Sequence, residues 1–234
     1  MTAILKKELS SYFTSAIGYV VMAVYYFFAG LFFYFYCIVG NSKDMASLFS
    51  NMFMITVLVI PIITMKTFSE EKKQKTDQAV LTAPVGLGEI VAGKFLGSLV
   101  MFLCCVGIYV LFALTLTFYS APDWSVFLGN LLGSIILGAA MISIDIFISS
   151  LTESMIISAI VSMCFGLVIF FIDSISQLIS VTWISTAISS ISFVDHYSNF
   201  TKGILSVADT VFFLSIIALF NFLTLRVLEK RRWS

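Results

Sequence analysis

Six long apolar runs dominate this sequence, and each is long enough to cross a lipid bilayer as a helix. A helical span needs about 20 apolar residues. The runs are Ile17–Val39, Ser47–Met65, Ile90–Tyr119, Val126–Ser150, Met155–Asp173 and Asp209–Leu228. The alternating pattern that a membrane barrel needs is absent from them, so their backbone polar groups must pair within helices. The sequence therefore predicts an all-α, polytopic membrane protein with six transmembrane helices in a single domain, residues 1–234.

The composition supports an integral membrane protein and excludes several other classes. Hydrophobic residues make up 60% of the chain, charged residues 11%, and the mean hydropathy is +1.06. Soluble domains average about 45–50% hydrophobic residues and about 25% charged residues. The net charge of zero offers no basic field for a nucleic acid. Four cysteines without CxxC spacing and a single histidine predict neither a metal site nor a catalytic centre.

The distribution of lysine and arginine predicts the orientation in the membrane. Of the 13 such residues, nine fall before the first run, between the second and third, and after the last, and two more, Lys94 and Arg226, lie at the adjoining ends of the third and last runs. The two exceptions are Lys43 and Lys202. Because short cytoplasmic loops are enriched in lysine and arginine, both termini and the second connection are predicted to be cytoplasmic. We expect a multi-pass protein of the plasma (inner) membrane.

Two segments outside the runs have their own character. Residues 1–16 carry an apolar and a polar helical face, which predicts an interfacial helix that packs against the bundle; the alternative is a frayed tail. The apolar face holds Ile4, Leu5, Leu9, Tyr12 and Ala16, opposite Lys6, Lys7, Ser10 and Thr14. The outer connection, residues 174–208, mixes apolar residues with serines, so we expect short re-entrant or interfacial helices there.

The cytoplasmic segment 66–84 contains signals for the start and end of a helix. Thr67 and Glu70 have the spacing of a capping box, and Pro84 disfavours helical geometry at the residue before it. In a helix, one mostly apolar side would be formed by Phe68, Thr76, Ala79, Val80 and Ala83. Such a helix suits the groove of a partner protein. The alternative is a solvated, positively charged loop.

The same segment resembles a signature of exporter-type (type 2) ABC transporter permeases. Glu70-Glu71-Lys72-Lys73, Thr76 and Val80-Leu81-Thr82-Ala83-Pro84 follow the pattern found after the second span of that family, most closely in the gliding-motility type. The turn Phe147–Glu153 and the stretch His196–Gly203 are also similar to that group. The chain departs from the pattern at Lys75, where glycine is usual, and at Gln78, where glutamate is usual.

This resemblance implies a permease subunit of an exporter, whose cytoplasmic coupling helix docks on a separate ABC ATP-binding subunit. The implied docking residues are Glu70, Glu71, Lys72, Thr76, Ala79, Val80, Leu81 and Pro84. A complete transporter would contain two permease chains, identical or related, and two ATPase subunits. ATP and magnesium would be bound by the partner, and this chain would hold no cofactor.

Other readings of individual residues remain open at this point. Gly88–Phe95 nearly matches a phosphate-binding loop, but Phe95 replaces the required hydroxyl. Close helix packing by Gly93 and Gly97, with Lys94 extending to the interface, explains the stretch better. Asp145, inside the fourth run, either lines a pathway or pairs with a helix, or else lies at the water interface.

Two rival functions follow from the polar residues. A non-ABC ion channel or secondary carrier would use Asp145 and the outer segment as its ion path. An intramembrane enzyme would need a serine beside His196.

The predicted topology places both termini in the cytoplasm and Asn41, Trp124 and His196 outside. In a background without native cysteines, Asn41→Cys should react with an impermeant maleimide in intact cells. Gln74→Cys should react only after the membrane is permeabilised, because its side chain lies on the inner side. The reverse labelling pattern would invert the whole topology.

Overall fold

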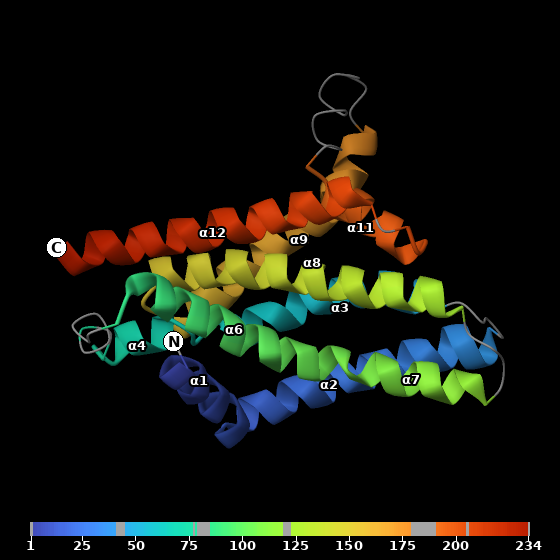
Figure 1. The fold of residues 1–234 in the computed structure, drawn as a ribbon, viewed down its shortest axis with the longest axis horizontal. Coiled ribbons are helices and arrows are strands. Elements are labelled where there is room, and N and C mark those ends of the chain that lie inside the picture. The colour runs from blue at the N-terminus through green and yellow to red at the C-terminus, as the bar shows by residue number, and fades with distance from the viewer. Residues whose placement is uncertain are drawn as a thin grey trace.

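The computed structural model describes residues 2–40, 45–76, 78, 85–118, 123–178, 191–204 and 206–233, with the backbone alone at 173–178 and 233. This part of the chain is built from helices and contains no strand (Figure 1). The helices are α1 (Thr2–Thr14), α2 (Ala16–Phe33), the π-helix η1 (Tyr34–Val39), α3 (Ala46–Thr64), α4 (Ser69–Lys73), α6 (Leu87–Val106), α7 (Ile108–Thr117), α8 (Trp124–Leu151), α9 (Met155–Leu178), α11 (Phe193–Thr201) and α12 (Val207–Trp233).

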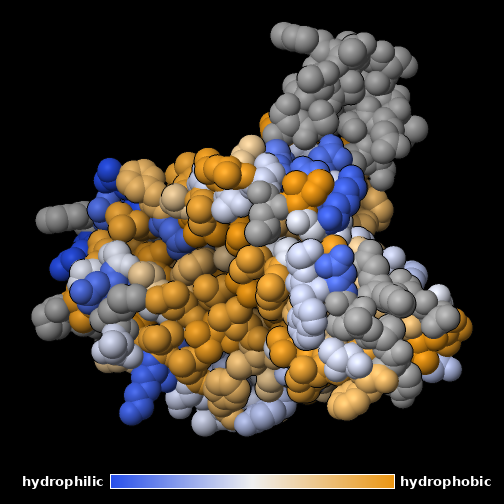
Figure 2. Space-filling model, turned by 45° about the vertical axis from the view of Figure 1, so that its right-hand side comes forward, coloured by the Kyte–Doolittle hydropathy of each residue, from blue (hydrophilic) through white to orange (hydrophobic). Residues whose placement is uncertain are grey.

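Six helical stretches are long and apolar enough to cross a membrane, which confirms the predicted fold class. They are Ala16–Val39, Ala46–Lys73, Leu87–Thr117, Trp124–Leu151, Met155–Ile172 and Val207–Arg232. The boundaries lie within a few residues of the apolar runs, with two exceptions: the second stretch continues past Met65 through α4 to Lys73, and the third is divided at Gly107 into α6 and α7. Figure 2 shows apolar side chains covering the middle of one face, with hydrophilic ones gathered at its left edge and on its right side.

The helix α8 is the scaffold of the bundle. It packs against α3, α6, α9, α11 and α12, and it is the most completely buried of the six stretches. Its small residues allow this crowding, because a neighbour can approach the backbone where no large side chain intervenes. A Cβ on Gly133 would lie 2.5 Å from Cβ of the buried Phe200 in α11, and one on Gly129 would lie 3.0 Å from Cα of Gly203. These glycines therefore serve packing within the chain.

The helix α1 lies across α6 at the end of the molecule that holds both termini and α4 (Figure 1). Glycines of α6 make the contact possible: a Cβ on Gly93 would lie 2.9 Å from Ile4, and one on Gly97 would lie 2.7 Å from Glu8. Tyr12 of α1 is also buried. The predicted N-terminal helix that packs against the bundle is confirmed, and the frayed tail is excluded.

The outer connection contains a helix that docks on the bundle. In α11, Phe193, Tyr197 and Phe200 are buried, and Asn130 of α8 donates a hydrogen bond from Nδ2 to the carbonyl oxygen of Thr201 at 3.2 Å. The helix of the fifth span, α9, continues to Leu178, beyond the predicted end of the apolar run at Asp173. The short re-entrant pieces expected around Trp183 lie outside the described residues.

The packing of α8 predicts opposite effects for the same substitution at two glycines. Gly133→Ala should destabilise the protein by about 1–3 kcal/mol, because the new methyl group collides with Phe200. Gly30→Ala should be neutral or stabilising by up to about 1 kcal/mol, because its nearest neighbour is 4.0 Å away and alanine favours the helix. Thermal unfolding in detergent measures both; equal effects would contradict the packing described.

Candidate functional site

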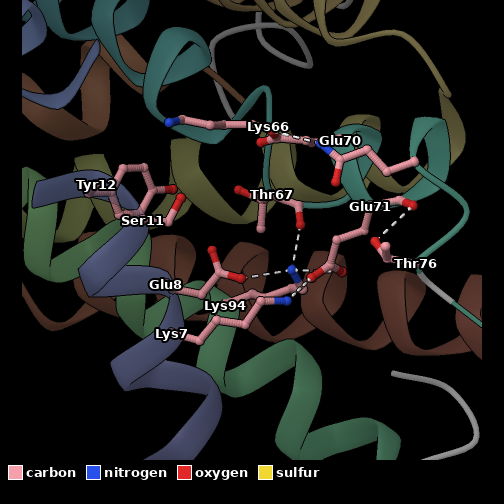
Figure 3. A pocket seen from close by; sticks show the side chains of 11 residues that line it. Lys7, Glu8, Ser11, Tyr12, Lys66, Thr67, Glu70, Glu71, Thr76 and Lys94 are labelled. Carbon is pink, nitrogen blue, oxygen red and sulfur yellow. Dashed lines mark hydrogen bonds and ion pairs between the residues drawn. The ribbon is translucent and has the colours of Figure 1, made fainter. Parts of the chain in front are cut away.

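A pocket of about 300 Å³ opens between α1, the connection from α3 to α4, and α6 (Figure 3). Charged side chains of both signs line it, including Lys7, Glu8, Lys66, Glu70, Glu71 and Lys94. Its elements come from three separate parts of the sequence, and it lies at the end of the molecule that carries the segment 66–84. This is the region in which the sequence places most of its candidate functional residues.

Lys94 is the centre of this site. Its side chain is 1% exposed, and Nζ lies 2.8 Å from Oε1 of Glu8 and 3.0 Å from Oε2 of Glu71. Nζ also donates a hydrogen bond to the carbonyl oxygen of Thr67 at 2.5 Å. Figure 3 shows the two carboxylates and the ammonium group pointing toward one another. Buried charges persist in proteins where they are paired and hydrogen-bonded in this way.

The expectation that Lys94 extends to the membrane interface is therefore wrong. The lysine turns inward because α1 and α4 bring carboxylates to it, and these lie 86 and 23 positions away in the chain. A buried ammonium without such partners would have to reach water. Glu8 is not among the predicted site residues; it lies on the buried side of α1 between the apolar residues of its packing face, where spacing alone does not distinguish it.

Two further contacts fasten α1 to its neighbours. Nζ of Lys7 lies 2.7 Å from Oε1 of Glu71, so Glu71 bridges two lysines. Burial lowers the pKa of Lys7, but the hydrogen bond and the charge of Glu71 outweigh burial and raise it above the ordinary value. The Tyr12 hydroxyl donates to the carbonyl oxygen of Ile63 at 3.0 Å and lies 3.1 Å from Oγ of Ser98. Burial raises the pKa of Tyr12 to about 12, so the hydroxyl stays protonated.

The helix α4 is attached to the end of α8 by serine hydroxyls. Oγ of Ser149 accepts hydrogen bonds from the backbone N–H groups of Phe68 and Ser69, at 3.2 and 3.3 Å. Oγ of Ser69 donates to the carbonyl oxygen of Ser149 at 3.1 Å. Nζ of Lys72 donates to the carbonyl oxygen of Ser150. Because backbone groups take part, α4 is held in place as a unit.

The predicted continuous helix through Glu70–Ala83 is corrected by the structure. The helix begins at Ser69 with Phe68 at the N-cap position and no side-chain cap, so Thr67 does not form the expected capping box. It ends at Lys73, and Lys75 has a φ of 56°, a left-handed conformation that breaks the helix. Glycine adopts this conformation without steric cost. The left-handed φ at this position explains why the pattern that the segment resembles has glycine here.

The predicted docking residues fall into three groups. Glu71 and Lys72 face the bundle through the contacts described above, and Glu70 is partly buried. Thr76 is exposed, with Oγ1 donating to the carbonyl oxygen of Glu71 at 3.3 Å. The others, Ala79, Val80, Leu81 and Pro84, lie outside the described residues. The outward-facing surface therefore starts at Lys73 and runs through Thr76.

Asp145 is buried in the bundle with 4% of its surface exposed, so the alternative of a water-exposed position is wrong. It forms a hydrogen bond with Ser162 of α9. The tight turn after Leu151 lays α9 back along α8, which brings these two residues opposite each other. Ser158, one turn from Ser162, is also buried, and its hydroxyl has no hydrogen-bond partner among the described residues.

A second polar cluster joins α11 to the start of α12. Nδ1 of His196 lies 2.5 Å from Oδ1 of Asp209, and Nδ2 of Asn199 donates to Oδ2 at 2.8 Å. The His196 ring stacks on Phe212 with its centroid 4.0 Å away. Asp209 is 4% exposed, because α11 covers it. The arrangement fixes α11 on the bundle.

Comparison with known proteins identifies a family. A family model described as "ABC-2 family transporter protein" matches residues 13–233. The match includes all six spans, α4 and α11, and it leaves out nearly all of α1. No curated protein matches the chain by sequence similarity.

The buried charges predict that two lysines of the site differ sharply in importance. Lys94→Met should lower the free energy of unfolding by about 3–5 kcal/mol, because it leaves Glu8 and Glu71 without their buried cation. Lys7→Met should cost about 1 kcal/mol or less, because the Lys7 side chain is 60% exposed. Chemical unfolding in detergent compares the two. Similar losses would show that the Lys94 pairs are not the stabilising contacts.

Proposed function

Since the chain belongs to the ABC-2 transporter family and is a membrane-spanning permease subunit of an ABC transporter, we propose that it exports its substrate under the control of a separate ATP-binding subunit. That subunit docks on the segment 66–84 and supplies the ATP and magnesium chemistry. Two permease chains, identical or related, form the complete transporter in the plasma membrane. The resemblance of residues 70–85 to the gliding-motility type supports that subgroup as the proposed assignment.

The observation that carries the docking proposal is that α4 is bonded to two spans of the bundle and leads directly into an exposed stretch. Its inner side is fastened to α8 through Ser149 and to α6 through Glu71 and Lys94. Its last residue, Lys73, and the residues that follow it as far as Thr76 are exposed. A segment that is accessible to a partner and bonded to two spans is suited to transmit a displacement of the partner to those spans.

The proposed mechanism uses this attachment. ATP binding brings the two ATPase subunits together and displaces the coupling segment on each permease. The displacement tilts the first, second and fifth spans about the dimer axis and favours the outward-open arrangement. In thermodynamic terms, ATP binding shifts a population because the ATPase dimer binds one arrangement more tightly than the other.

Asp145 is proposed to pair helices in this movement. It joins α8 to α9, the fourth and fifth spans, through Ser162. A carboxyl group at bilayer depth is costly unless it has a partner, which favours retaining the contact while the spans tilt. The rival reading as a non-ABC channel or carrier has no support from the family match.

Docking predicts that a bulky charge at the centre of the segment is more harmful than loss of a charge at its edge. Thr76→Arg and Ala79→Arg should abolish co-purification of the ATPase or uncouple its hydrolysis from transport, because buried interface centres tolerate such changes poorly. Lys73→Gln, a neighbouring exposed position, should weaken binding by no more than about 1 kcal/mol.

Membrane insertion should be unchanged in all three variants, because no apolar run is altered, and expression in the membrane fraction is the control. Co-purification and ATPase activity in reconstituted vesicles report the two possible defects. If both arginine variants keep full ATPase binding and coupled transport, the docking assignment is wrong.

A further inference from the structure

An apolar groove separates the first two spans near the end of the molecule that carries both termini. It has a volume of about 320 Å³ and is lined only by apolar side chains of α2 and α3 and by Met65. The lining on α2 includes Ile17, Val20 and Val24, which are 39%, 59% and 41% exposed. These side chains face the lipid, so the groove opens sideways into the bilayer.

One end of the groove is marked by a cation. Lys66 follows the groove residue Met65, and its Nζ lies 3.2 Å from Oγ of Ser15, which precedes the groove residue Ala16. Within the described residues, no carboxylate oxygen lies within 4 Å of this ammonium group. Figure 3 shows the Lys66 side chain extending away from the cluster around Lys94. Its charge is therefore available to an anion at the mouth of the groove.

The dimensions of the groove match a single leaflet. From Ala16 to Val24 on α2, and from Val59 to Met65 on α3, the lining extends about 9–12 Å at 1.5 Å per residue. Half of a hydrocarbon core of about 30 Å is about 15 Å. An acyl chain that enters beside Lys66 would thus follow the groove toward the middle of the bilayer.

We propose that this groove binds an anionic phospholipid of the leaflet on the side of the termini, with its phosphate at Lys66 and Ser15 and one acyl chain between α2 and α3. Basic positions between transmembrane helices are suited to anionic head groups. A second copy of the chain is a poorer occupant, because its α2 carries no charged residue to meet Lys66. Lys66 begins the segment 66–84, but it precedes the exposed stretch from Lys73 to Thr76 on which docking is proposed, and the lipid site does not depend on the proposed function.

The test is a lipid titration of the purified full-length chain in mild detergent, followed by native mass spectrometry. The probes are dioleoyl phosphatidylglycerol and zwitterionic dioleoyl phosphatidylcholine. Phosphatidylglycerol should bind more tightly, and Lys66→Gln should weaken its binding about fivefold or more, the equivalent of about 1 kcal/mol for one basic residue near the head group. Lys73→Gln removes the same charge from an exposed position of α4 and should leave binding unchanged.

The acyl-chain half of the site is tested separately. Val20→Trp fills the groove and should weaken phosphatidylglycerol binding about as much, whereas Val168→Trp, at a similarly exposed position of α9, should not. Val24→Trp serves in place of Val20→Trp if that variant does not fold. Glycerophosphoglycerol, the head group without acyl chains, should not compete with the lipid.

Any one of four results would overturn the proposal. A loss in Lys66→Gln no larger than that in Lys73→Gln, or a loss in the groove-filling variant no larger than that in Val168→Trp, removes the site. Competition by glycerophosphoglycerol would replace the lipid with a soluble phosphate ligand. Unchanged lipid binding together with dissociation of a permease dimer in Val20→Trp would assign the groove to a second copy of the chain.

Discussion

A buried ammonium group joins the three elements α1, α4 and α6 at the end of the molecule that is predicted to face the cytoplasm. Nζ of Lys94 in α6 contacts Glu8 of α1, Glu71 of α4 and the carbonyl oxygen of Thr67. Removing charges from water is costly, and the mutual attraction offsets that cost only if each group keeps its partners. The position of each element is therefore tied to that of the other two.

The bundle behind this site depends on close packing rather than on burial from water. Lipid tails are as apolar as leucine side chains, so helices in a membrane associate through backbone proximity and polar contacts. In α8 the glycines admit α11, and Ser149 holds the backbone of α4. The same helix also pairs Asp145 with Ser162 of α9. One well-packed helix thereby connects the proposed docking segment to the outer connection.

The two ends of the molecule use polar groups differently. At the end with both termini, charges of opposite sign line a pocket of about 300 Å³, and the stretch from Lys73 to Thr76 at the end of α4 is exposed. At the other end, Asp209 pairs with His196 and Asn199 and is covered by α11. The first arrangement leaves a surface for a partner, and the second closes the bundle around its polar groups. This difference agrees with the proposed docking of an ATP-binding subunit at the end that carries both termini.

The sequence by itself determined the number of spans, their approximate limits and the family, because long apolar runs permit few structures in a bilayer and the motif order is retained along the chain. It also predicted the packing helix at the N-terminus from its two faces. Only the tertiary structure decided that Lys94 turns inward, that Asp145 is buried, and that the helix after the second span breaks at Lys75. The direction of a long polar side chain depends on partners from distant segments, and local spacing carries no information about where those segments meet.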